Sequence, residues 1–333
     1  MKNKNTWPIS APENFRIDHP QIEGLRRAVE NSKVKSCLVL REGQLVYQYY
    51  KSNKIRDNLQ RVNSCTKSII SILIGIAIEN GYIPSVNMTM EHFFPDIVNH
   101  QIDTRKKDIT IEHLLTMSIG LDWPEFGAWN YMPPMFAHDV VKFVFDRELV
   151  DELGTRMNYN SGCSHVLSAI ITKTTGMKTS VFADEMLFKP LGIDKDYRWF
   201  EDAKGISYGS DGLRLLPNDM AKFGQLYLQK GFWEGKQIVS EDWITKSTEP
   251  YLLTYDTIGH YASHWWVTKL NQDQNDLSLN NRMFFAMGRN GQFIIVIPSL
   301  QTVVVFTGTL DNTIKPLDFV REFIVKSTRA SDG

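Results

Sequence analysis

The sequence predicts an α+β fold, in which an antiparallel β-sheet assembled from both ends of the chain is flanked by helices and interrupted by an all-helical lobe. Segments rich in β-branched and aromatic residues occur near both termini, whereas helical patterns predominate from about residue 90 to 231. Strands that resume after a run of helices pair most simply in one sheet. We therefore expect a sheet-containing lobe from residues 1–85 and 232–333, with an inserted helical lobe at 86–231.

The individual elements follow from local patterns. Residues 22–31 have a helical pattern, and strand-like residues 36–40 and 44–50 are joined by a glycine-containing turn typical of a hairpin. Residues 68–80 are apolar nearly all round and are followed by Gly81, as in a helix enclosed in a core. The later predicted helices are 111–117, 139–145, 164–175, 180–187, 218–229 and 316–326. The later predicted strands are 264–268, 282–286, 292–297 and 302–307.

Composition is that of an ordinary globular protein. A net charge of −1, from 37 basic and 38 acidic residues, argues against nucleic acid or an anionic membrane as a partner. The apolar run 69–78 is too short to span a membrane, and the amino terminus lacks a signal-peptide core, so we expect a cytoplasmic chain. His260 and His264 have helical spacing, but no third ligand accompanies them, so we expect neither a metal nor a cofactor. The oligomeric state stays open.

A Ser-x-x-Lys pair, Ser64 and Lys67, stands at the start of the apolar helix. Residues three apart share a helix face, so the hydroxyl and the amine can reach each other. Partial burial favours the neutral amine, which can then accept a proton from a hydroxyl. The same pattern also arises by chance, as at Ser32 and Lys35, but no buried helix follows that pair. Cys65 is a weaker nucleophile candidate, because on a helix it points about 100° away from Ser64.

Two later segments could complete an acyl-transfer site. Residues 159–162, Tyr-Asn-Ser-Gly, lie in a turn before the helix expected at 164–175. Residues 288–292, Gly-Arg-Asn-Gly-Gln, precede a strand, where a glycine-rich entry lets backbone N–H groups approach a substrate carbonyl. Taken alone, each segment is more often structural, since such a tyrosine usually packs and Arg-Asn-Gly is usually a hairpin turn.

In chain order, Ser64-x-x-Lys67, Tyr159-Asn-Ser161 and Arg289-Asn-Gly291 resemble the three signature motifs of the serine β-lactamase and penicillin-binding-protein superfamily. The likeness covers almost the whole chain. It is strongest to the branch with class C β-lactamases, carboxylesterases of that fold and nylon-oligomer (aminohexanoate-dimer) hydrolases. The resemblance implies a β-lactamase/transpeptidase-like fold and a serine hydrolase that forms an acyl-enzyme from a small ester, amide or peptide-like substrate. A β-lactamase or D-Ala-D-Ala carboxypeptidase is the alternative.

The resemblance also implies roles for particular residues. Ser64 becomes the nucleophile, Lys67 its general base partner and Tyr159 a second proton shuttle. The backbone N–H groups of Ser64 and Gln292 would form the oxyanion hole.

Two positions depart from the family motifs. The usual Tyr-x-Asn ends in Ser161, which is shorter than Asn, so we expect weaker contacts to a substrate amide. The usual Lys-Thr-Gly is Arg289-Asn290-Gly291, and Arg289 either keeps a charge for a substrate carboxylate or points away in a turn. We expect substrate contacts from all four of these residues.

Other hypotheses remain at this point. Gly205-Ile-Ser207-Tyr-Gly209 matches the nucleophile elbow of α/β-hydrolases, but it lacks the preceding apolar strand and the following helix. A non-catalytic protein of the same fold that binds peptidoglycan fragments or β-lactams is a third class. The aromatic and proline-rich segment 120–136, with Trp123 and Trp129, either lines the acyl pocket or packs over the helical lobe.

Overall fold

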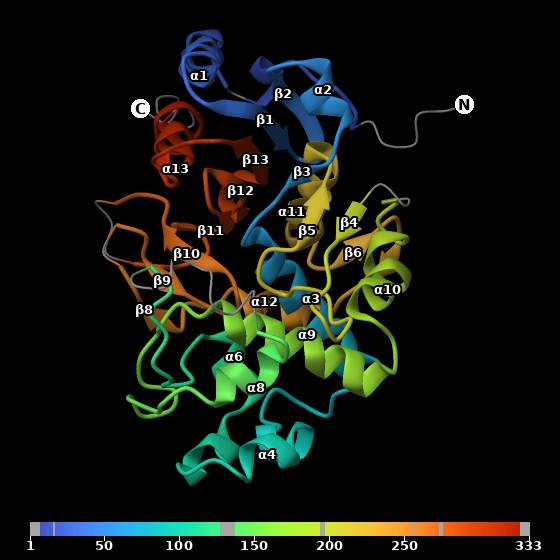
Figure 1. Ribbon diagram of the computed structural model, residues 1–333. Coiled ribbons are helices and arrows are strands. Elements are labelled where there is room, and N and C mark those ends of the chain that lie inside the picture. The colour runs from blue at the N-terminus through green and yellow to red at the C-terminus, as the bar shows by residue number, and fades with distance from the viewer. Residues whose placement is uncertain are drawn as a thin grey trace.

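The fold combines one large antiparallel sheet with a group of helices, joined by the long helix α3 (Figure 1). The computed structural model describes residues 7–15, 17–126, 137–193, 197–255, 257–272 and 276–326. Strands from both ends of the chain share the large sheet, and most of the helices from the middle of the chain lie beyond α3. The predicted α+β fold class is therefore confirmed.

The large sheet has eight strands in the order β2-β1-β13-β12-β11-β10-β9-β8, and all neighbours are antiparallel. Its central pairing joins the two ends of the chain, with Cys37 opposite Phe306. The strands are β1 (Val34–Arg41), β2 (Gln44–Tyr50), β8 (Leu252–Leu253), β9 (His260–Tyr261), β10 (Trp266–Lys269), β11 (Arg282–Gly288), β12 (Gln292–Ile297) and β13 (Thr302–Gly308). Two small sheets contain β3 (Gln60–Arg61), β4 (Tyr197–Trp199), β5 (Leu213–Leu215), β6 (Phe232–Trp233) and β7 (Lys236–Gln237).

Helices cover the sheet and build the other end of the molecule. The α-helices are α1 (His19–Glu30), α2 (Asn53–Asp57), α3 (Cys65–Glu79), α4 (Met90–Phe93), α5 (Pro95–Val98), α6 (Ile111–Leu115), α8 (Val140–Phe145), α9 (Ser161–Thr175), α10 (Thr179–Ala183), α11 (Pro217–Leu228), α12 (Glu241–Ser247) and α13 (Lys315–Val320). The 3₁₀-helices are η1 (Pro12–Phe15), η2 (Thr104–Asp108) and η4 (Pro298–Leu300), and the π-helical segments are η3 (Asp184–Phe188) and η5 (Arg321–Val325). No helix among the described residues is long and apolar enough to cross a membrane.

Helix α3 is buried along nearly its whole length, as its sequence predicts. Thirteen of its residues are buried, from Cys65 to Ala77, and they include both Lys67 and Ser68. The helix packs against α9 on one side and against β11 and β12 on the other. Because it touches both the sheet and the helices, a side chain at its first turn lies between the two parts of the fold.

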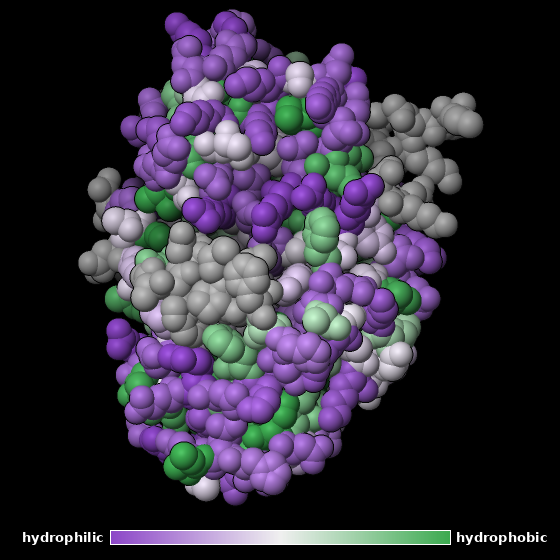
Figure 2. Space-filling model, in the orientation of Figure 1, coloured by the Kyte–Doolittle hydropathy of each residue, from purple (hydrophilic) through white to green (hydrophobic). Residues whose placement is uncertain are grey.

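The division into two lobes remains a prediction. Helix α11 falls inside the segment 86–231 that we expected to be the inserted lobe, yet it packs against β1, β12 and β13 of the large sheet. Gly224 allows this approach, because a Cβ there would lie 2.5 Å from Val303 Cγ1. The described surface seen in Figure 2 is mainly hydrophilic, with apolar residues in small separate groups.

Candidate active site

Ser64 is the N-cap of α3 and lines a cavity of 490 Å³. The residue before it, Asn63, has a left-handed backbone with φ of +49°, a conformation that asparagine tolerates better than most residues. The Asn63 side chain donates a hydrogen bond to the Arg289 carbonyl at 2.8 Å. Strand β11 also packs closely against this turn, because a Cβ on Gly288 would lie 2.4 Å from the Val62 carbonyl oxygen. Close packing of β11 against residues 62–63 thus fixes the hydroxyl of Ser64 at the cavity wall.

Lys67 lies one turn into the helix and contacts three oxygen atoms. Its Nζ donates to Ser64 Oγ at 3.1 Å, to Ser161 Oγ at 3.0 Å and to the Ser210 carbonyl at 3.0 Å. The side chain is 1% exposed. Burial lowers the pKa of Lys67, while the nearby charges of Glu125 and Asp211 act in the opposite direction. A lowered pKa increases the share of the neutral amine, the form that accepts a proton.

Helix α9 begins at Ser161 and not at Ser164, so the turn expected at residues 159–162 is already helix at its end. Asn160 is the N-cap, and its Oδ1 accepts from the Cys163 N–H at 3.2 Å. Ser161 is therefore the first helical residue, and its Oγ accepts from Lys67 Nζ at 3.0 Å. The next position, 162, has no room for a side chain, because a Cβ on Gly162 would lie only 2.4 Å from Val144 Cγ2.

Glu125 is a site residue that sequence reasoning missed. It is 3% exposed, lines the cavity and accepts from both the hydroxyl and the backbone N–H of Ser161, the latter at 2.6 Å. Trp123 Nε1 donates to the same carboxylate at 2.8 Å. The sequence offers only an indirect sign of this role. The first N–H groups of a helix such as α9 lack partners within the helix, so an acidic side chain is favoured near them.

Tyr159 lies beside Lys67 in an aromatic cluster. Lys67 Nζ is 5.0 Å from the centroid of its ring, within cation–π range. The ring stacks on Trp266 at 5.8 Å and on Phe126 at 5.2 Å, and it meets Tyr261 edge-on at 6.3 Å. The structure thus brings Tyr159 to the general base predicted from the sequence, with its ring packed firmly in place. Its role in proton transfer stays a prediction.

The turn between β11 and β12 faces Ser64. Asn290 and Gly291 have φ of +66° and +83°, and the Asn290 side chain donates to the Leu310 carbonyl at 3.1 Å, which anchors the turn. Gln292 begins β12, lines the cavity and donates from Nε2 to the Gly308 carbonyl at 2.9 Å. Of the turn residues predicted to contact substrate, Arg289 and Asn290 line the cavity, although the Asn290 amide holds the loop, and Gly291 does not line it and packs against Leu310 instead.

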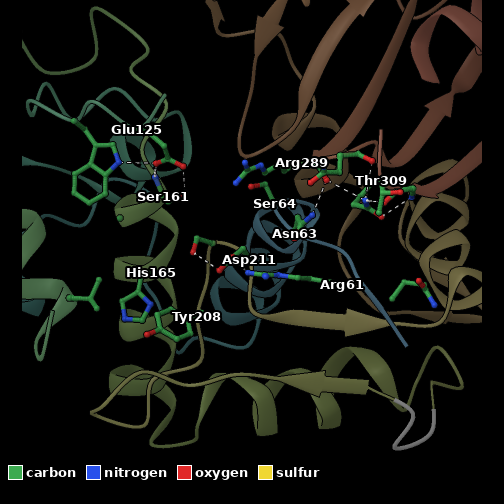
Figure 3. A pocket seen from close by; sticks show the side chains of 18 of the residues that line it. Arg61, Asn63, Ser64, Glu125, Ser161, His165, Tyr208, Asp211, Arg289 and Thr309 are labelled. Carbon is green, nitrogen blue, oxygen red and sulfur yellow. Dashed lines mark hydrogen bonds and ion pairs between the residues drawn. The ribbon is translucent and has the colours of Figure 1, made fainter. Parts of the chain in front are cut away.

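The cavity walls differ in charge. In Figure 3, Glu125, Ser161 and His165 lie on one side of Ser64, and Arg289 and Thr309 lie on the other. The lining also includes Lys35, Arg61 and Asp211, and Arg61 pairs with Asp211 at 2.6 Å. His165 Nε2 lies 2.9 Å from Asp202 Oδ2 in a buried pair that sequence reasoning also missed.

The competing nucleophiles are enclosed. Ser207 is fully buried in a loop, its hydroxyl accepts from the Ser180 N–H at 3.3 Å, and no strand-turn-helix surrounds it among the described residues. Cys65 is buried, and burial raises the pKa of its thiol. His260 lies in strand β9 and His264 in the bend that precedes β10, so their i, i+4 spacing does not place them on one face of a helix. Trp129 lies outside the described residues.

A family model described as beta-lactamase matches residues 35–327. The chain belongs to the beta-lactamase family. Family membership confirms the resemblance that the three motifs suggested, over most of the 333 residues. It does not by itself assign a substrate or a residue role.

Individual relatives share the fold at low sequence identity. The 6-aminohexanoate-dimer hydrolase of Paenarthrobacter ureafaciens is 22% identical in an alignment of 311 residues that covers 86% of this chain and 75% of the relative. A Bacillus anthracis protein proposed to be a 6-aminohexanoate-dimer hydrolase superposes with a TM-score of 0.76 at 19% identity, over 98% of this chain and 88% of the other. EstCE1, a hydrolase with promiscuous acyltransferase activity, gives 0.73 at 15% identity, over 92% and 98%.

Proposed function

We propose that this protein is a serine hydrolase that cleaves an ester or amide bond of a small molecule through an acyl-enzyme on Ser64. One observation carries the proposal. Lys67 Nζ lies 3.1 Å from Ser64 Oγ at the head of a buried helix, and Ser64 faces a 490 Å³ cavity. A nucleophile and a base within hydrogen-bond reach, with the base held by further partners, are what covalent acyl transfer requires.

The first half of the reaction forms the acyl-enzyme. The Ser64 Oγ–H bond breaks and its proton passes to Lys67 Nζ, while Oγ forms a bond to the substrate carbonyl carbon. The resulting oxyanion accepts from the backbone N–H groups of Ser64 and Gln292, the proposed oxyanion hole. Collapse then breaks the bond to the leaving group, which receives a proton from Lys67 or, through it, from Tyr159.

The second half releases the acid. A water molecule gives a proton to the same base and attacks the acyl carbon, and the Ser64 Oγ–acyl bond breaks. Ser64 recovers its proton, and the carboxylic acid leaves. Tyr159 is the proposed second group in these transfers, supported by its ring 5.0 Å from Lys67 Nζ.

Short-chain esters are the favoured substrates. In the family motif, the residue at position 161 is an amide that contacts the substrate, whereas the Ser161 hydroxyl here already contacts both Lys67 and Glu125. Recognition of a substrate amide through this residue is therefore weakened. Arg289 and Lys35 also line the cavity and favour a substrate that carries a carboxylate.

Covalent labelling tests the proposal. A fluorophosphonate probe should label the wild-type protein, and peptide mapping should find the label on Ser64. Ser64→Ala should lose both the label and ester hydrolysis while keeping its circular dichroism and melting temperature. A label on Ser207 or Cys65, or hydrolysis by the folded Ser64→Ala protein, would reject the assignment. A folded wild-type protein that takes no label and turns over no ester would instead be a binding protein.

A further inference from the structure

Glu125 contacts Ser161 at both its hydroxyl and its backbone N–H. Its Oε1 accepts from the Ser161 hydroxyl, and its Oε2 accepts from the Ser161 N–H at 2.6 Å and from Trp123 Nε1 at 2.8 Å. Three donors thus hold the carboxylate in one orientation. Ser161 Oγ is in turn 3.0 Å from Lys67 Nζ, so a continuous chain of contacts runs from Ser64 through Lys67 and Ser161 to Glu125.

The chemistry of a carboxylate fixes the direction of these hydrogen bonds. An ionised carboxylate only accepts, so the Ser161 hydroxyl proton must point toward Glu125. The lone pairs of Ser161 Oγ are then left for a Lys67 N–H. A second N–H of Lys67 goes to the Ser210 carbonyl at 3.0 Å. With these two N–H groups directed away, the lone pair of the neutral amine faces Ser64, where it can accept the hydroxyl proton.

We propose that Glu125 is a positioning residue for the general base, acting on Lys67 through the Ser161 hydroxyl. This inference rests on the proposed acyl transfer at Ser64. Glu125 neither gains nor loses a proton in the reaction. When the Ser64 proton moves to Lys67, Ser161 keeps its own proton on the side of Glu125.

The charge state of Lys67 depends on the titratable groups around it, and the pH dependence of the rate reports this charge state. Among the described residues, the titratable side chains that interact with Lys67 are Glu125, Asp211, Cys65, Cys163, Tyr159 and His264. Burial raises the pKa of both thiols and lowers that of His264 to about 3, so these three are uncharged near neutral pH. Glu125 and Asp211 are the acidic side chains in this set, and removal of the Glu125 charge alone must change the titration of Lys67.

Glu125→Gln separates the shape of the side chain from its charge. The amide oxygen can still accept from Ser161 N–H and Trp123, but the amide nitrogen now donates to Ser161 Oγ. The Ser161 proton must then turn toward Lys67 and compete for its lone pair. At the pH plateau we expect kcat/KM on p-nitrophenyl butyrate to fall roughly 10- to 100-fold, the loss of one hydrogen bond to a charged group. The rising limb of the pH profile should move to lower pH, because loss of a nearby anion lowers the pKa of Lys67.

Further variants make the test specific. Ser161→Ala should lower the plateau to a similar extent, and the double variant should be no lower than Ser161→Ala alone, because Glu125 acts through the hydroxyl. Glu125→Asp keeps the charge, so its rising limb should stay near the wild-type pH. Asp122→Asn is the matched control. Asp122 is a carboxylate of the same segment, but it pairs with Arg147 at 2.7 Å and does not line the cavity that contains Ser64. This variant should change neither quantity.

A folded Glu125→Gln protein that keeps the wild-type plateau, or keeps the wild-type pH profile, would overturn the inference. Plateau losses that multiply in the double variant would overturn it as well, because Glu125 would then act independently of Ser161. The fluorophosphonate label separates this outcome from failure of the proposed function. If Ser64 of the wild-type protein is labelled, acyl transfer stands whatever Glu125→Gln does.

Discussion

Replacement of Lys67 by methionine removes the proposed general base while keeping a side chain of similar length. The wild-type amine makes three contacts, of which the one to Ser64 Oγ at 3.1 Å is the proton-transfer path. The other two, to Ser161 Oγ and the Ser210 carbonyl, aim it. Methionine can make none of them, so Ser64 keeps its hydroxyl in the cavity but has no base one turn along the helix.

The expected loss follows from the role of this contact. A positioned general base contributes roughly 10²- to 10⁴-fold, which corresponds to about 3–5 kcal/mol in the barrier. Burial lowers the pKa of Lys67, so the wild-type rate should rise with pH as the amine loses its proton and then level off. In Lys67→Met this rising limb should disappear, because the group that titrates is gone.

Initial rates on p-nitrophenyl butyrate across a pH series measure both effects. Lys106→Met is a matched control, because Lys106 is also a buried lysine whose Nζ donates to a carbonyl, that of Phe145 at 2.8 Å, but it lies away from the cavity. This control should cost stability and leave kcat unchanged. A folded Lys67→Met protein that loses less than about tenfold in kcat/KM, or keeps the wild-type rising limb, would refute the reasoning.

Three further predictions follow from the site. Steady-state kcat/KM should be higher for p-nitrophenyl acetate or butyrate than for nitrocefin, because the Ser161 hydroxyl is already occupied; a higher value for nitrocefin than for both esters would make the protein a β-lactamase. Tyr159→Phe should keep the aromatic packing and lower kcat less than Lys67→Met does, and a rate near wild type would remove the hydroxyl from the mechanism. Burial lowers the pKa of His264 to about 3. The neutral imidazole therefore contributes to the free energy of unfolding above its unfolded pKa of 6.5, and this contribution is lost as pH falls toward 3. In urea unfolding, the free energy of unfolding of His264→Asn should rise with pH in this window less steeply than that of the wild-type protein, by up to about 1.4 kcal/mol per pH unit. Equal slopes for the two proteins would contradict the lowered pKa of His264.

Local patterns were sufficient for much of the fold. The apolar run behind Ser64 predicts a buried helix, and α3 is one. Alternating and β-branched segments predict the strands, and the two chain ends do meet, with Val39 opposite Val304. The position of α11 was not predictable in the same way. Its buried face would suit either lobe, and only the close approach at Gly224 shows that it belongs to the sheet.

Site residues that contact one another within one sequence motif were predicted. Site residues whose contacts join segments far apart in the sequence were missed. Ser64 and Lys67 are one helical turn apart, so their contact follows from spacing. Glu125 contacts Ser161, which lies 36 positions later in the chain, and nothing local in its aromatic, proline-rich segment marks it as buried. Ser210 contributes a backbone carbonyl, which no side-chain pattern reveals. The start of α9 was misjudged by three residues, because the helix begins at Ser161 with Asn160 as its cap and not at Ser164.

The central claim is that Ser64 carries the acyl group during turnover. Its most direct test is rapid acid quenching of the protein mixed with p-nitrophenyl butyrate, followed by mass spectrometry of the intact chain and of its peptides. The account predicts a transient mass increase of one butyryl group, located on the peptide that contains Ser64 and absent in Ser64→Ala. Steady ester turnover by wild-type protein with the butyryl group on another residue, or persisting in the Ser64→Ala protein, would contradict it.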